Sequence, residues 1–189
     1  MAKRDKHQSH LLRHDFKDIL SSQLIATTGG VVAGSLLAIA SNKIELIPGL
    51  LVLIPGFLEM KGSISGSLAA RLSSGLILGA VKPQIKWNHI IKGNVIASFL
   101  LSVIVSIILG LVVYLLLNLF LGINNFSIVL IALFAGIIAN LIGIPLTVYH
   151  TFRIYKEGHD PNNIIGPYVT AEGDIISIIA ILIAIVVII

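Results

Sequence analysis

The sequence predicts an all-α, polytopic membrane protein with five transmembrane helices, and two observations support this prediction. Hydrophobic residues make up 56% of the chain and charged residues only 12%, and the mean hydropathy is +1.00. A soluble domain needs more charge to stay dissolved, so most of the surface of the folded chain is expected to face lipid. In addition, five apolar stretches long enough to cross a bilayer are separated by turn residues or charges. Lipid offers backbone groups no hydrogen-bond partner, so each stretch should be helical.

The N-terminal residues depart from this apolar pattern. Segment 1–18 is polar for too long to be the start of a cleaved signal peptide, and it carries acids as well as bases. We interpret it as a retained cytoplasmic segment, followed by one five-helix domain over residues 19–189. The predicted spans cover about residues 19–40, 44–81, 89–121, 127–155 and 168–189.

The second of these stretches is too long for one simple span, and it contains several helix-breaking residues. We therefore expect a broken helix, with the break in the sequence PGFLEMKGSISG, which begins at Pro55 and contains Gly62 and Gly66. Backbone carbonyls freed at membrane depth are tolerated where they line a cavity or hold an ion. The alternative is a kink that serves helix packing only.

The distribution of lysine and arginine predicts the orientation of the chain. With the N-terminus in the cytoplasm, the basic clusters before the first span and after the second and fourth spans all fall on the cytoplasmic side, and only Lys43 falls outside. We expect a multi-pass protein of the cell membrane with its C-terminus outside. The scattered bases indicate topology rather than nucleic-acid binding. With no cysteine, the chain can form neither a disulfide nor a thiolate metal site.

A few polar side chains remain at the predicted membrane depth. An unpaired charge near the bilayer centre costs at least about 2.5 to 3.5 kcal/mol, so such residues usually face a partner or a water-filled path. They are Glu59, Lys61, Ser63, Ser65, Ser67, Arg71, Thr170, Glu172 and Asp174. We treat them as candidate functional residues; structural ion pairs between helices, or positions in the interface where water reaches them, are the alternative.

Helical geometry separates the two acids of the fifth stretch. Thr170 and Asp174 are four residues apart and share one helix face, whereas Glu172 is turned well away from both. Asp174 with Thr170 gives an oxygen-only cluster, which suits a hard cation such as Mg²⁺. Glu172 is expected either to pair with Lys61 or Arg71, or to bind a second ion.

Two segments resemble the MgtE-type magnesium transporters and the related eukaryotic solute carriers. PGFLEMKGSISGSLAARLSSGLILG, residues 55–79, resembles the region in which a Pro-rich start leads through a Gly-centred break into a small-residue helix. GHDPNNIIGPYVTAEGDIISI, residues 158–178, resembles the last helix of the same family, where an Asp-Pro loop and a Gly-Pro start precede a threonine and a pore aspartate. The resemblance covers essentially the whole predicted transmembrane portion.

The resemblance implies a divalent-cation pathway formed by two five-helix units around a two-fold axis. Asp174 would take the position of the pore-lining aspartate, and Thr170 the ligand-supporting position one turn before it. Ser63 stands where bacterial members have an asparagine, and would contribute a hydroxyl or orient hydrating water. Glu59 stands where members often have glycine, so the number and charge of the bound ions can differ here.

The resemblance also implies a partner subunit. Bacterial members carry large cytoplasmic N-terminal and CBS domains that sense magnesium, whereas this chain has a short N-terminal segment. We expect regulation of that kind to be absent or supplied by another protein. The eukaryotic relatives fuse two five-helix units, so this chain resembles half a transporter. It would form a homodimer, or a heterodimer with a paralogous five-helix subunit.

The predicted function is therefore transport of a divalent cation, Mg²⁺ first, with Mn²⁺, Co²⁺ and Ca²⁺ as alternatives that share oxygen ligands. An enzyme is not expected, because the chain has no nucleotide-binding loop, no HExxH and no Ser-His-Asp arrangement. Channel and carrier remain open, and a Na⁺- or H⁺-coupled exchanger would use Glu172 as its coupling site. A non-conducting assembly or receptor subunit is the alternative from another class.

Overall fold

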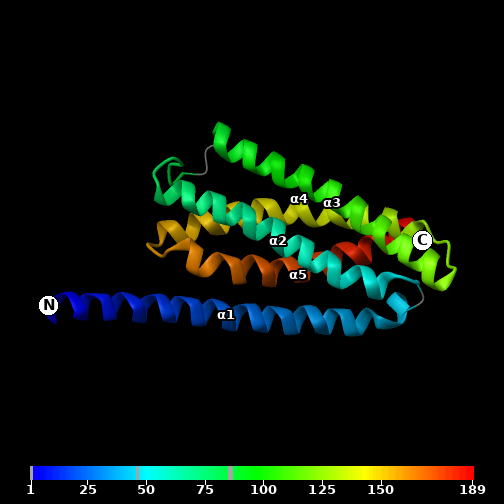
Figure 1. Cartoon of the computed structure of the whole chain (residues 1–189), viewed down its shortest axis with the longest axis horizontal. Helices are drawn as coiled ribbons and strands as arrows, with labels where there is room; N and C mark the ends of the chain where they lie inside the picture. The colour runs from blue at the N-terminus through cyan, green and yellow to red at the C-terminus, as the bar shows by residue number, and fades with distance from the viewer. Residues whose placement is uncertain (1, 46, 85–86) are drawn as a thin grey trace.

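Five long helices account for almost all of the part of the chain that the structure describes. The computed structural model describes residues 2–45, 47–84 and 87–189, with side chains from residue 16 onward apart from Lys43. No strand occurs in these ranges. The helices are α1 (Ala2–Glu45), α2 (Leu50–Ile77), α3 (His89–Leu121), α4 (Ser127–Lys156) and α5 (Pro161–Ile188) (Figure 1). The prediction of five helices is confirmed for the described residues.

Successive helices run in opposite directions, so the chain traverses the bundle five times (Figure 1). The N-terminus, the α2–α3 connection and the α4–α5 connection lie at one end, and the C-terminus lies at the other. The basic residues of these segments whose side chains are described, such as Lys82, Lys92 and Lys156, are therefore gathered at one end of the bundle. The side chain of Lys43, the predicted external base, lies outside the described residues.

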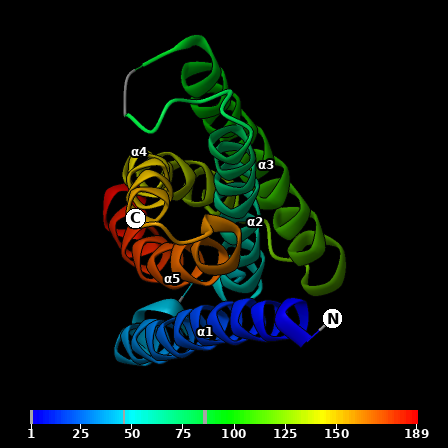
Figure 2. The ribbon, with the colours of Figure 1, turned by 90° about the vertical axis from the view of Figure 1, so that its left-hand side faces the viewer.

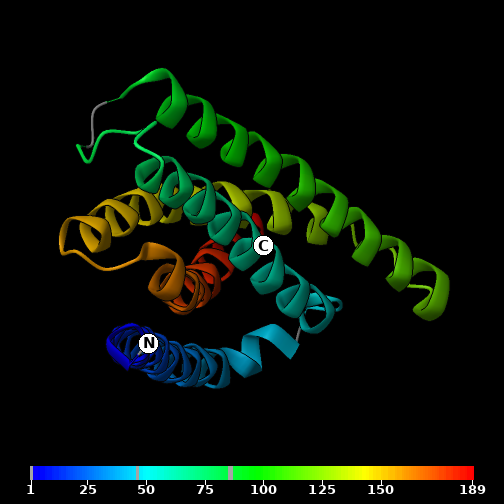
Figure 3. The same cartoon turned by 60° about the vertical axis from the view of Figure 1, so that its left-hand side comes forward.

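Helix α5 lies at the centre of the arrangement, in contact with α1, α2 and α4. Viewed along the bundle, α1 lies on the outside against α5, and α3 lies on the opposite side (Figure 2). Helix α2 runs between α3 and α5 (Figures 1 and 3). The main apolar core joins α2, α4 and α5 through side chains such as Phe57, Ile131 and Ile181. Small residues allow α1 to approach α5 closely, since Gly29 of α1 lies directly against Ala171 of α5.

Four helices are long and apolar enough to cross a membrane: Phe16–Asn42, His89–Leu121, Ser127–Lys156 and Pro161–Ile188. Helix α2 is not among them in the described residues, because Glu59, Lys61, Arg71 and several serines lower its hydropathy. Helix α1 runs unbroken through residue 18, so the proposed boundary between a cytoplasmic segment and the first span stays a prediction.

The predicted break in the second helix is not found at residues 55–66. The chain turns earlier, at Gly49 with its φ of 93°, and α2 is then continuous from Leu50 to Ile77. Pro55 removes only one backbone donor, and helix interiors tolerate this where neighbouring helices hold both sides. Here α3 packs against Gly56 through Leu109, and α5 approaches Gly62 through Thr170.

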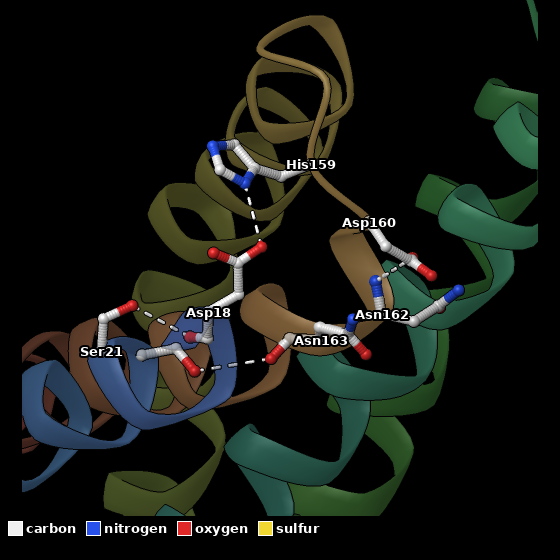
Figure 4. Close-up of polar contacts among 7 residues, drawn as sticks. Asp18, Ser21, His159, Asp160, Asn162 and Asn163 are labelled. Carbon is white, nitrogen blue, oxygen red and sulfur yellow. Dashed lines mark hydrogen bonds and ion pairs between the residues drawn. The ribbon is translucent and has the colours of Figure 1, made fainter. Parts of the chain in front are cut away.

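Helix α5 begins at Pro161, earlier than the predicted start near residue 168. Asp160 caps it by accepting a hydrogen bond from the backbone N–H of Asn162 at 2.9 Å, and proline suits the first helical position. Pro167 therefore lies inside the helix, where it leaves the carbonyl of Asn163 without its helical donor. Ser22 Oγ of α1 donates a hydrogen bond to this carbonyl at 3.4 Å. Nearby, Asp18 Oδ2 of α1 lies 3.0 Å from His159 Nδ1 (Figure 4).

Candidate cation site

An open pocket of about 450 Å³ lies between α2 and α5, and most of the predicted site residues line it. Six of them meet here although the two helices are far apart in the sequence. From α2 come Pro55, Glu59, Gly62 and Ser63, together with Leu58, and from α5 come Thr170 and Asp174. Gly66 lies further along α2 and does not line the pocket.

Helical spacing explains why these side chains converge. Glu59 and Ser63 are four residues apart on α2, as Thr170 and Asp174 are on α5, so each pair occupies two successive turns of one face. Gly62 has no side chain, and its nearest neighbour across the gap is Thr170. The hydroxyl of Thr170 donates to the carbonyl of Gly166 at 3.0 Å, which turns its oxygen lone pairs toward the remaining space.

The pocket offers two carboxylates and two hydroxyls, and no nitrogen or sulfur ligand. Glu59, Ser63 and Thr170 are exposed on the isolated chain, and Asp174 is half-buried. Oxygen donors of this kind suit hard divalent cations, which retain part of their water shell. The described side chains contain no group of three or more His, Cys, Asp or Glu residues around one point. A divalent cation held by these oxygens would keep part of its water shell, because two carboxylates and two hydroxyls do not complete its coordination.

Glu172 lies apart from this pocket, as its helical position predicted, but its expected partners were wrong. Its Oε1 is 2.9 Å from His150 Nε2 of α4, and neither Lys61 nor Arg71 reaches it among the described contacts. The ring of Tyr168 packs against His150 at a centroid distance of 5.7 Å. This pair could not be predicted from the sequence, because His150 comes from another helix and the contact depends on how α4 and α5 pack.

The two predicted ion-pair cations instead bind hydroxyl groups. Lys61 Nζ donates to Ser65 Oγ at 2.7 Å, and Arg71 Nη2 donates to Ser98 Oγ of α3 at 3.2 Å. Neither forms an ion pair among the described residues. Lys61 is also buried, with 1% exposure. Lys61 reaches Ser65 because the two are four residues apart on α2. Arg71 reaches Ser98 because α2 packs against α3.

The contact between Glu172 and His150 predicts a structural role for this acid. Glu172→Ala is expected to lower the free energy of unfolding by about 1 kcal/mol, because a partly buried imidazole loses its hydrogen-bond partner. Flux of a divalent cation through the folded variant should be unchanged, since Glu172 is outside the pocket. Thermal unfolding and flux in proteoliposomes check both parts. Loss of flux in a folded variant would contradict the structural role.

Comparison with protein families gives a match to a transporter family. The MgtE model, described as a divalent cation transporter, matches residues 54–184, a range that contains every residue of the pocket. A comparison with curated proteins found no match, and neither did a comparison with solved structures.

Proposed function

The chain belongs to the MgtE family of divalent cation transporters, and we propose that it carries Mg²⁺ across the cell membrane through the pocket between α2 and α5. This is a family of transporters and not of enzymes. The observation that carries the proposal is the meeting of Glu59, Ser63, Thr170 and Asp174 in one pocket. Mg²⁺ is the preferred cargo because it keeps several waters while one or two carboxylates hold it.

Each side chain has a defined part in this proposal. Asp174 binds the ion or its water shell, and Glu59 supplies a second negative charge from the facing helix. Ser63 and Thr170 accept hydrogen bonds from water molecules of the shell or contact the ion directly. Mn²⁺, Co²⁺ and Ca²⁺ use oxygen ligands as well, and the size of the assembled pathway would discriminate among them.

We also propose that two chains assemble around this pocket. Its polar residues lie at the outer surface of the isolated bundle, where Glu59 and Ser63 are exposed. Contact of these groups with lipid would be unfavourable, and a second five-helix unit across a two-fold axis would cover them. The second unit is a copy of this chain or a paralogous subunit. The gathering of basic residues at one end of the bundle favours an N-terminus in the cytoplasm and a C-terminus outside.

The absence of cysteine allows a direct test of this assembly. Ser63→Cys, introduced as the only cysteine, is expected to give a crosslinked dimer with a short thiol-specific reagent in the membrane. Leu119→Cys is the control, because Leu119 is 76% exposed on α3 and lies away from the pocket. Gel mobility reports the outcome. Equal crosslinking of both variants, or of neither, would contradict a homodimer built around the pocket.

Transport itself is tested by ion flux into proteoliposomes. The purified chain is reconstituted with a fluorescent Mg²⁺ indicator inside, and empty liposomes are the control. We expect the rate of Mg²⁺ entry to saturate with Mg²⁺ concentration, and we expect added Mn²⁺ or Co²⁺ to reduce that rate by competition. No flux from a folded, dimeric preparation would contradict the proposal and favour a non-conducting membrane subunit.

A further inference from the structure

The two carboxylates of the pocket belong to the same chain. Glu59 comes from α2 and Asp174 from α5, and both line the pocket of about 450 Å³ between these helices. The negative charge of Glu59 also acts electrostatically on the Asp174 carboxyl group. A single chain therefore brings two interacting negative charges to one pocket.

No cation of the chain offsets these two charges in the part that the structure describes. Neither carboxylate forms an ion pair there, and no lysine, arginine or histidine lines the pocket. The two basic side chains of α2 are hydrogen-bonded to serines outside the pocket, Lys61 to Ser65 and Arg71 to Ser98. Because like charges repel and unpaired charge at membrane depth is costly, the two carboxylates need a positive partner.

A divalent cation matches this pair of carboxylates in charge and in ligand chemistry. Two carboxylates neutralise one dication, and Mg²⁺ is usually bound by one or two carboxylates while it keeps several waters. Ser63 and Thr170 line the same pocket, and their hydroxyl oxygens can contact the ion or its water shell. The charge of one such ion is thus balanced without any group from a second chain.

Resting on the proposed function, we infer that each chain holds its own divalent cation, bound between Glu59 and Asp174. A dimer then contains two ions in two pockets, and not one ion shared by two aspartates at the two-fold axis. Glu59 determines this difference, because without it each chain would bring a single negative charge to the pocket. Two ions neutralise the four carboxylates of a dimer, whereas one shared ion would leave two negative charges uncompensated.

The test counts the Mn²⁺ ions that the purified chain binds in detergent, measured by equilibrium dialysis without Mg²⁺. Mn²⁺ is the probe because it is bound by the same carboxylate and water oxygens. We expect binding to saturate at one Mn²⁺ per chain, and added Mg²⁺ to displace it. Saturation at one Mn²⁺ per two chains, or no saturable binding by the folded chain, would overturn the inference.

Two variants connect this count to the pocket. Glu59→Gln keeps the size of the side chain and removes its charge, so the count should fall to at most one Mn²⁺ per two chains, and KM for Mg²⁺ flux should rise about tenfold. Glu172→Gln is the control and should keep one Mn²⁺ per chain, because Glu172 contacts His150 outside the pocket. Asp174→Asn replaces Glu59→Gln if the latter does not fold, as judged by size-exclusion chromatography. An unchanged count in the folded pocket variant would also overturn the inference.

Failure of the inference and failure of the proposed function give different results. Mg²⁺ flux by a wild type that binds one Mn²⁺ per two chains would overturn the inference and leave transport in place. Absence of flux from a wild type that binds one Mn²⁺ per chain would reject transport, and the ion site within each chain would stand.

Discussion

Asp174→Asn is expected to reduce Mg²⁺ flux by about hundredfold or more, because removing a charge within a few ångströms of the ion costs several kcal/mol in a partly desolvated site. The substitution keeps the shape of the side chain, so the fold should be unaffected. Asp174 faces the pocket from α5, and a dimer would lose the charge twice.

Glu172→Gln provides the matched control for this result. It removes the same charge two residues away on the same helix, from a side chain that contacts His150 instead of the pocket. Flux into proteoliposomes measures both variants. Equal loss of flux in the two, with both folded, would mean that general electrostatics of α5 and not the pocket controls transport.

Gly110→Ala is expected to destabilise the bundle by about 1–3 kcal/mol, the usual cost of overpacking a close contact. A Cβ at Gly110 of α3 would lie 2.8 Å from Val129 Cα and 3.1 Å from Ala132 Cβ of α4. Because the nearest atom belongs to the backbone, no change of rotamer relieves the clash, and the two helices must separate.

Gly93→Ala on the same helix is the control for this prediction. A Cβ there meets nothing within 4 Å, so the change should be neutral or stabilising by up to about 1 kcal/mol through helix propensity. Unfolding in detergent, followed by circular dichroism, compares the two. If Gly110→Ala were as stable as Gly93→Ala, this result would contradict the close packing of α3 against α4 at Gly110.

The sequence predicted the number of helices and the bounds of α3 and α4 because apolar runs and turn residues mark them directly. The spacing of Thr170 and Asp174 also predicted that these two side chains share one helix face, and both line the pocket. That Glu59 and Ser63 of α2 face them was not predicted from spacing, and Glu172, a further candidate ligand, lies outside the pocket.

What could not be predicted depends on contacts between helices. Whether Pro55 or Pro167 interrupts a helix is decided by neighbours that supply or replace hydrogen bonds, as Ser22 does for the carbonyl of Asn163. The pairing of Glu172 with His150 requires two helices to be placed first. For the start of α5, the signal was present in the Asp160 cap and the proline after it.

The central claim is that the cation passes through the pocket between α2 and α5. The most direct measurement uses Ser63→Cys as the only cysteine and a small, charged thiol reagent that requires water to reach its target. We predict that the reagent blocks Mg²⁺ flux, that Mg²⁺ slows the modification, and that the cysteine-free wild type is insensitive. Complete modification of Cys at this position with undiminished flux would show that the ion takes another path.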